Sequence, residues 1–339
     1  MRCTITIAAL LMLLALAGCR KELCCDHDHW KTNVLPEWEL VWERDYGHMW
    51  ESNWDNPGGY VYDSLRPQPG TGIAALVYKE DGSHTERHLE ADGGVLPVGE
   101  GRHSILFYND NTEYIVFSSM DSYAEASATT RTRTRSMYIE RHGDESTVNS
   151  PDMLFGAWVD ELVVEYSPDA APENLSVTLK PLVYKYVIVY EFSKGIEHVR
   201  LARGAIAGMA QSVYLQDGRT GSEKATVLFD ESKIDMVGSR IVAQVSTFGV
   251  PDYPDKYYPA KAPGEVTGIF GLNLEVKLPD GSIKTFEFDI SGQMADQPRG
   301  GVIVVSGLEI NDGDFATPGG GFDVGVDGWG EYEDIELPL

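Results

Sequence analysis

Only a few short stretches of this chain carry residue types whose spacing could do chemistry. The first ends at Cys19, which closes an apolar run over 5–17 that follows the positively charged Arg2. Charge, apolar run and small residues in that order are typical of a secretory signal peptide, here with a cysteine where other signals carry a small residue. Residues 1–18 are therefore predicted to be a signal peptide.

The sequence Leu-Ala-Gly-Cys resembles a bacterial lipobox, which implies cleavage before Cys19 and acylation of its thiol and new amino group. The alternatives are a transmembrane anchor or an unlipidated signal. The apolar run is too short for an anchor, because a spanning helix needs about 20 apolar residues. Two or more acyl chains hold a protein on a membrane durably, at about 0.8 kcal/mol per buried methylene. The rest of the chain is then a module outside the cytoplasm.

Two further stretches could bind ligands. Trp50, Trp54 and Tyr60 lie on a long predicted loop, where aromatic rings either stack on sugars or cap a β-sandwich. Arg131, Arg133 and Arg135 form the densest basic cluster of an acidic chain. That cluster is a solvated loop or edge strand, a site for an arginine-specific protease, or a site that captures phosphate or anionic glycan.

Catalytic and metal-binding motifs are missing from the sequence. There is no Gly-x-Ser-x-Gly elbow, no His-Glu-x-x-His and no phosphate-binding loop. The run 26–29, Asp-His-Asp-His, has metal-ligand residue types but reads better as a solvated spacer. Asn311, Asp312 and Asp314 have only part of the spacing of a calcium loop. We therefore predict no catalytic residue, no metal and no cofactor.

Composition limits the class of partner. The chain has 339 residues and a formal net charge of -26, so nucleic acid and anionic lipid are poor partners. Its length suggests about two domains. Of its four cysteines, only the adjacent Cys24 and Cys25 remain once Cys3 leaves with the signal and Cys19 is acylated, so disulfides do not hold the fold together.

The remaining chain must position these residues with strands. Apolar residues alternate with polar ones over 37–43, 270–278 and 286–290, and 72–78 is also predicted to be a strand, with tight turns at 80–83 and 279–282. From Leu182 to Phe192 both faces are apolar, as in a strand at the centre of a sandwich. The stretch 204–215 is compatible with a helix or a strand. We predict an all-β chain: a tether over 19–35, β-sandwiches over 36–172 and 173–310, and an acidic, glycine-rich tail over 311–339.

Several segments together carry a family resemblance. They are the lipobox, 107–113 (Phe-Tyr-Asn-Asp-Asn-Thr-Glu), the 182–192 strand, 203–209, 288–290 and 300–303. In this order they resemble the fimbrillin-like lipoproteins of gut and oral anaerobes, in a branch near the fimbrial anchor and accessory subunits. The resemblance implies two tandem transthyretin-like, Greek-key β-sandwiches displayed on the outer membrane. It also implies partner fimbrial subunits that join by strand addition.

Three functions compete at this stage. The first is a surface-exposed, non-catalytic lipoprotein that anchors, caps or decorates a fimbria and takes part in cell adhesion. The second is a glycan-binding surface lipoprotein that uses the aromatic loop. The third is a hydrolase, for which no residue pattern argues. In the resembling family, polymerising subunits lose a first strand to an arginine-specific protease, whereas the arginine cluster here lies deep in the first predicted domain. That difference favours the anchor or accessory role.

Overall fold

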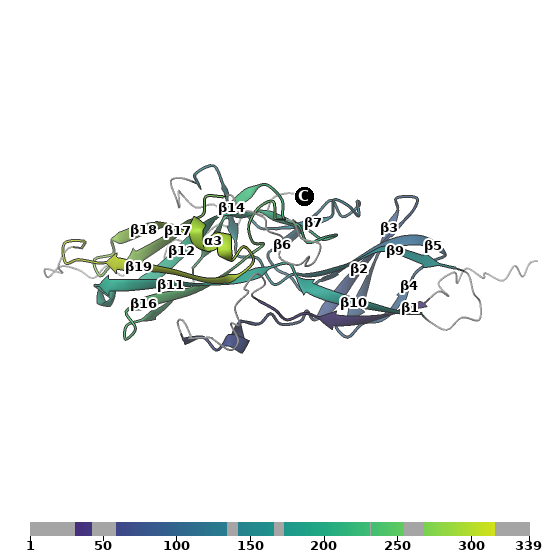
Figure 1. Ribbon diagram of the computed structural model, residues 1–339, viewed down its shortest axis with the longest axis horizontal. Helices are drawn as coiled ribbons and strands as arrows, with labels where there is room; N and C mark the ends of the chain where they lie inside the picture. The colour runs from purple at the N-terminus through teal and green to yellow at the C-terminus, as the bar shows by residue number, and fades with distance from the viewer. Residues whose placement is uncertain are drawn as a thin grey trace, which may run out of the picture.

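The computed structural model describes residues 31–42, 59–133, 142–165, 173–230, 232–253 and 268–315. Strands dominate these residues, and the α-helix they contain, α3 (Ser291–Asp296), has six residues. The all-β class predicted from period-two alternation is confirmed. Figure 1 shows the strands gathered into two bodies along an elongated molecule.

The first body, at the right of Figure 1, is built on a seven-stranded sheet with the order β3-β2-β5-β9-β10-β1-β4. β9 and β10 share only two residue pairs, and at this narrow joint the sheet doubles over. The two halves enclose one core, to which Ile73 and Phe107 contribute from one half and Val34 and Leu179 from the other. The strands are β1 (Lys31–Trp38), β2 (Gly72–Lys79), β3 (His84–Glu90), β4 (Gly94–Pro97), β5 (Gly101–Asn109), β9 (Phe155–Val164) and β10 (Glu173–Pro181).

The second body packs a four-stranded sheet, β15-β16-β11-β19, on a five-stranded sheet, β18-β17-β12-β14-β8. Tyr186, Ile188 and Tyr190 of β11 point into the core between the sheets, whereas Val187 and Val189 point to the opposite face. This confirms the prediction of a strand buried on both faces. The strands are β8 (Ser146–Asn149), β11 (Tyr184–Lys194), β12 (Leu201–Ala210), β14 (Lys224–Phe229), β15 (Ser232–Asp235), β16 (Arg240–Thr247), β17 (Gly271–Lys277), β18 (Ile283–Asp289) and β19 (Gly301–Glu309).

Strand pairing crosses the domain boundary that the sequence predicts at 172/173. β8 lies parallel to β14 in the second body, whereas β10 belongs to the first. A three-stranded sheet, made of β6 (Ile115–Ser118), β7 (Ser127–Thr130) and β13 (Ser212–Tyr214), draws strands from both sides of the boundary. Its apolar side chains pack on the outer face of the β2–β5 half of the large sheet. The exact division into two domains stays a prediction.

The first strand lies earlier in the chain than the sequence pattern indicates. β1 begins at Lys31, so residues 31–35, assigned above to the tether, are strand. It ends at Trp38, although alternation continues to Trp42. The strand has these bounds because its partners β10 and β4 pair with residues 31–38. Trp42 lies outside this pairing and packs elsewhere.

Trp42 crosses to the second body. Its side chain is 1% exposed and packs with Val187 and Val189 on the outer face of the four-stranded sheet. The short 3₁₀ helix η2 (Tyr62–Leu65) covers the same face, and the rings of Tyr62 and Trp42 lie 5.7 Å apart. Figure 1 shows this early segment running along the underside of the second body. The two bodies are therefore joined by buried contacts as well as by exchanged strands.

The local turns match the sequence. β2 and β3 form a hairpin over 79–83, and β17 and β18 form one in which the Leu278 N–H donates to the Ser282 carbonyl. The ambiguous stretch 204–215 is strand, divided between β12 and β13.

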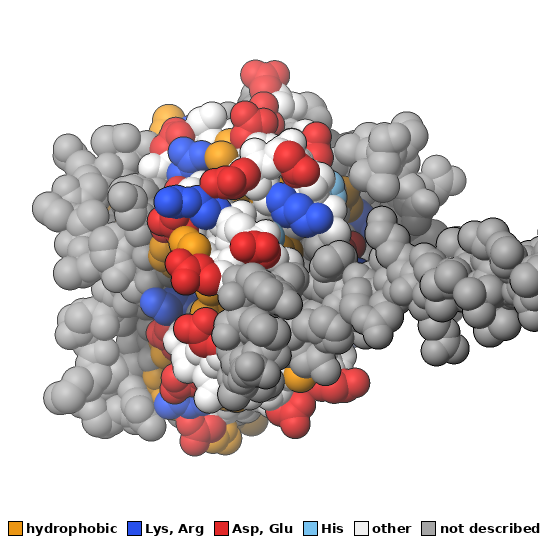
Figure 2. All heavy atoms as spheres, turned by 90° about the vertical axis from the view of Figure 1, so that its right-hand side faces the viewer, with side chains coloured by type: hydrophobic (Ala, Val, Ile, Leu, Met, Phe, Trp, Pro, Cys, Tyr) orange, Lys and Arg blue, Asp and Glu red, His pale blue; other side chains and the backbone are white. Residues whose placement is uncertain are grey.

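Figure 2 looks on to the end of the first body, where acidic and basic side chains lie interspersed.

Candidate functional site

β1, the first described strand, lies between two other strands of the large sheet. It runs parallel to β10 over seven residue pairs and antiparallel to β4 over four. Val34 is fully buried in the first core, and the Trp38 ring meets Phe155 edge-on at 5.0 Å. The Trp38 indole N–H donates to the carbonyl of Ala91 at 3.0 Å. The strand is thus integrated into the sheet rather than laid against it.

Gly93 lets β4 approach β1 closely. Its φ of +99° is a conformation that L side chains rarely adopt, and a Cβ there would lie 2.2 Å from the carbonyl oxygen of Val34. The same Cβ would lie 2.6 Å from Cδ of Pro36. β4 pairs only with Lys31–Val34, so among the described strands Leu35–Trp38 pair with β10 alone, although Gly93 lies against Pro36. Leu35 on this stretch is 43% exposed.

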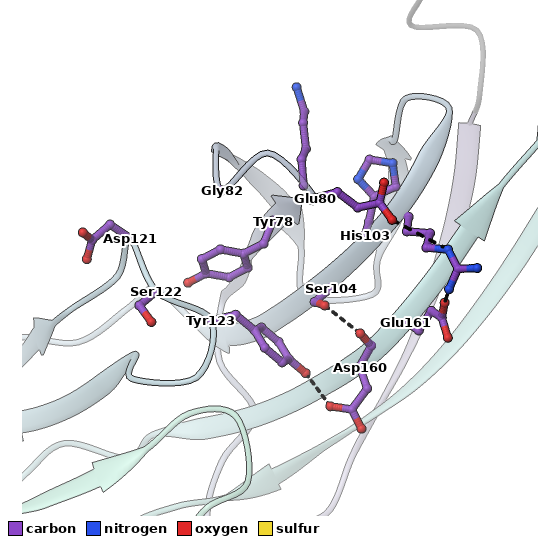
Figure 3. Close-up of a pocket in the computed structure, with 12 residues that line it drawn as sticks. Tyr78, Glu80, Gly82, His103, Ser104, Asp121, Ser122, Tyr123, Asp160 and Glu161 are labelled. Carbon is purple, nitrogen blue, oxygen red and sulfur yellow. Dashed lines mark hydrogen bonds and ion pairs between the residues drawn. The ribbon is translucent and has the colours of Figure 1, made fainter.

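A polar groove of about 660 Å³ opens on the same body, between the β2–β3 turn, β5, β9 and the turn at 119–123. Figure 3 shows Tyr78 and Tyr123 side by side, with ring centroids 5.5 Å apart, and Asp160 below them. The Tyr123 hydroxyl donates to the Asp160 carboxylate at 2.9 Å, and the Ser104 hydroxyl donates to the Asp160 carbonyl at 2.6 Å. The Tyr78 hydroxyl donates to the carbonyl of Met120 at 2.8 Å.

The hydroxyl groups of this groove fix the turn at 119–123 in place and are not arranged for proton transfer. Burial raises the pKa of Tyr78, as does the nearby Asp121 carboxylate, and burial with the Asp160 hydrogen bond raises the pKa of Tyr123. Both phenols therefore stay protonated at neutral pH and act as donors. The Ser104 hydroxyl donates to a backbone carbonyl rather than to a side-chain base that could activate it.

The charged rim of the groove is also paired internally. The Arg102 guanidinium forms an ion pair with Glu161, and its Nε lies 3.7 Å from a carboxylate oxygen of Glu80. No sequence motif announces this groove, because its residues come from four separate elements. A β-bulge between His103 and Ile105 brings β5 and β9 into the register that juxtaposes Ser104 with Asp160.

A second polar cluster is buried beside β12. The His142 Nδ1 lies 2.6 Å from Glu145 Oε1, and Glu145 Oε2 accepts from the Gly208 N–H at 3.0 Å and the Thr226 hydroxyl at 2.9 Å. Burial raises the pKa of Glu145, but these three hydrogen bonds outweigh it and hold the pKa below its usual value. The carboxylate therefore fastens the segment before β8 to the five-stranded sheet.

The predicted ligand and lipidation residues fall in different places. Cys19, Trp50, Trp54 and Arg135 lie outside the described residues. Tyr60 packs against the apolar cluster on the outer face of the second body, so one of the three proposed sugar-stacking rings is used in capping the sheet.

The arginine cluster is drawn into the sheets where the structure describes it. The Arg131 N–H donates to the carbonyl of Tyr114, and the Arg133 N–H donates to the carbonyl of Thr147. The Arg133 guanidinium also pairs with Asp230 at 2.8 Å. Such backbone bonding disfavours cleavage here, because a protease must bind an extended, unpaired segment; protease sensitivity stays a prediction.

Metal and membrane features are few among the residues described. They contain no group of three or more His, Cys, Asp or Glu side chains placed to hold a metal ion. In the 311–314 turn, Asp314 accepts from the Asn311 N–H and from the Lys284 ammonium, both at 2.6 Å. The same residues include no helix with the length and apolar character that crossing a bilayer requires.

Comparison with known proteins identifies relatives. Residues 65–230 match a family model described as a domain of unknown function, DUF5119. A Bacteroides ovatus protein provisionally named fimbrium anchoring subunit Fim4B is 26% identical over 290 residues, which cover 79% of this chain and 85% of that protein.

A solved structure shares the fold. It is a Bacteroides ovatus protein provisionally called an adhesin, with a TM-score of 0.57 and 21% identity. The match covers 88% of this chain and 98% of that chain. Residues 65–230 are thus similar to the DUF5119 model, and the chain is similar to a protein named as a fimbrium anchoring subunit, in agreement with the resemblance in its sequence.

Proposed function

We propose that this protein is a non-catalytic anchoring or accessory subunit of a fimbria, held on the outer membrane by acyl chains on Cys19. The observation that carries the proposal is β1, which lies hydrogen-bonded between β10 and β4 and is the first described element after Cys19. The relative named as a fimbrium anchoring subunit supports the same role. Membrane attachment and a firmly paired first strand are what an anchor needs.

The distance from the lipid to the fold is short. Twelve residues lead from Cys19 to Lys31, which span at most about 40 Å when fully extended. The excess of acidic side chains repels an anionic membrane surface. The lipid therefore supplies the attachment and the body stands off from the bilayer, available to a partner.

A partner subunit joins by strand addition in this proposal. Leu35–Trp38 extend beyond the β4 pairing and pair with β10 alone among the described strands. Their other side carries backbone groups that β-augmentation could use, although Pro36 has no N–H to donate. The polar groove does not enter the proposal, because its hydroxyl and carboxylate groups bind one another. Sugar binding at the aromatic loop has no described contact in its favour, since Tyr60 is packed on the sheet.

The attachment is tested by membrane fractionation of cells that carry Cys19→Ala. The variant is expected in the soluble fraction, whereas the parent protein partitions into detergent with the membrane. A variant that stays in the membrane fraction refutes lipid anchoring.

The partner is tested with a photo-crosslinking amino acid at position 35, with position 237 as the matched control. Leu35 is 43% exposed on β1, and Val237 is 99% exposed on the second body, far from β1 in sequence. A fimbrial subunit should crosslink to position 35 and not to position 237. Equal yields at both positions, or none at position 35, contradict strand addition beside β1.

A further inference from the structure

The last strand of the four-stranded sheet has an unusual neighbour. In the part of the chain that the structure describes, β19 pairs with β11 on one side and forms the edge of the sheet on the other. The helix α3 lies along that edge, between β18 and β19 in the chain, as Figure 1 shows. An exposed edge of this kind is a template for another strand.

Two glutamine side chains pair with the backbone of β19. The Gln293 amide donates to the Val304 carbonyl at 2.8 Å and accepts from the Val304 N–H at 2.9 Å. The Gln297 amide donates to the Val302 carbonyl and accepts from the Val302 N–H, both at 2.9 Å. Each glutamine therefore makes the reciprocal pair of bonds that a residue of an antiparallel strand would make.

The spacing of the two elements explains why a helix can do this. Residues four apart on a helix rise about 6 Å, and residues two apart on a strand lie roughly 6.6 Å apart. Gln293 lies on α3 and Gln297, four residues later, is the C-cap of the helix, while Val304 and Val302 stand two apart. The side-chain amides thus fall into the repeat of the strand.

The helix is held in place by contacts other than the glutamine side chains. Met294 is fully buried in the core of the second body. The Tyr186 hydroxyl donates to the Gln297 carbonyl at 2.9 Å, and the Phe270 N–H donates to the Ser291 hydroxyl at 3.0 Å. These contacts hold α3 to the core of the second body, whereas the glutamine amides join it to the backbone of β19, so removing the amides lets α3 move off that edge.

We propose that α3 guards the β19 edge against pairing with a second copy of this chain. The amides of Gln293 and Gln297 occupy the donors and acceptors that an antiparallel β19–β19 contact would use. Val304, which is 40% exposed beside them, would add apolar contact to such a pair. Strand addition at the β19 edge is thereby blocked. This goes beyond the anchoring role and does not depend on lipidation.

The test is the double variant Gln293→Ala/Gln297→Ala, with Asp296→Ala as a control on the same helix. Hydrogen exchange at the Val302 and Val304 amides should accelerate about fivefold, because each loses a bond worth about 1 kcal/mol. Sedimentation should show a dimer whose fraction rises with protein concentration. The control and the parent protein should stay monomeric with slow exchange at both amides.

Two outcomes overturn the proposal. One is unchanged exchange at Val302 and Val304; the other is accelerated exchange in a variant that remains monomeric at every concentration. If the double variant does not fold, Gln293→Ala alone serves, because the Gln297 pair remains. It should accelerate exchange at Val304 and leave Val302 slow, with weaker dimerisation than expected for the double variant, and a monomer again overturns the proposal.

Discussion

Gly93→Ala is expected to loosen β1 more than a glycine-to-alanine change in any other turn among the described residues. The new methyl carbon would lie 2.2 Å from the Val34 carbonyl oxygen, roughly 1 Å inside ordinary contact. Both nearest groups, that oxygen and the Pro36 ring, belong to β1, so the strand must move. Overpacking of this kind costs about 1–3 kcal/mol. The positive φ adds about 1–2 kcal/mol for any residue with a Cβ.

A matched variant separates the two costs. Gly82 in the β2–β3 turn has a φ of +80°, and a Cβ there meets nothing within 4 Å. Gly82→Ala therefore carries the conformational cost without the collision. The free energy of unfolding in urea should fall by about 1–2 kcal/mol for Gly82→Ala and by about 2–5 kcal/mol for Gly93→Ala.

Hydrogen exchange then locates the effect. The amides of β1 that pair with β4 should lose protection in Gly93→Ala and keep it in Gly82→Ala. Equal destabilisation by the two variants would refute the reasoning, because it would mean that the approach of Gly93 to β1 imposes no constraint.

Two further changes test the contacts that join distant segments. Trp42→Ala should destabilise the second body by about 3–5 kcal/mol, because it empties a fully buried site on the outer face of the four-stranded sheet. Calorimetry would detect this as a lower melting temperature, and an unchanged melting temperature would contradict the packing of Trp42. Glu145 has a depressed pKa, so its stabilising contribution is full above the unfolded pKa of about 4.5 and is lost as pH falls through the folded value. Unfolding of Glu145→Gln between pH 5 and about 3 should therefore depend less on pH than unfolding of the parent, and parallel curves would contradict the role of the His142–Glu145 contact.

The alternating run that ends at Trp42 shows what sequence pattern can and cannot say. Period two correctly indicated that Trp38 and Trp42 are apolar anchors. It could not show that Trp38 packs against Phe155 in the first body while Trp42 packs on Val187 in the second. Alternation specifies which side chains avoid water, and it does not specify which surface receives them.

The polar groove and the glutamine pair on the β19 edge could not be predicted from the sequence, for a related reason. Tyr78, Tyr123 and Asp160 are individually common surface residues, and only the bulged register of β5 against β9 brings them together. Gln293 and Gln297 carry a helical spacing, but six residues are too few to stand out as a helix in the sequence.

The sequence by itself determined the class of this protein, its hairpins and its central strand. Each of these rests on interactions between residues close together in the chain: alternation along one strand, a turn at 279–282, apolar faces on both sides of 182–192. Only the tertiary structure decided where β1 pairs, which strands the two bodies exchange, and that a helix closes the β19 edge. Those features depend on partners far apart in the chain, 141 residues for Thr32 and Glu173 and 79 for Ser146 and Ala225, or on the register between elements, and such pairing is chosen by the packing of the whole core.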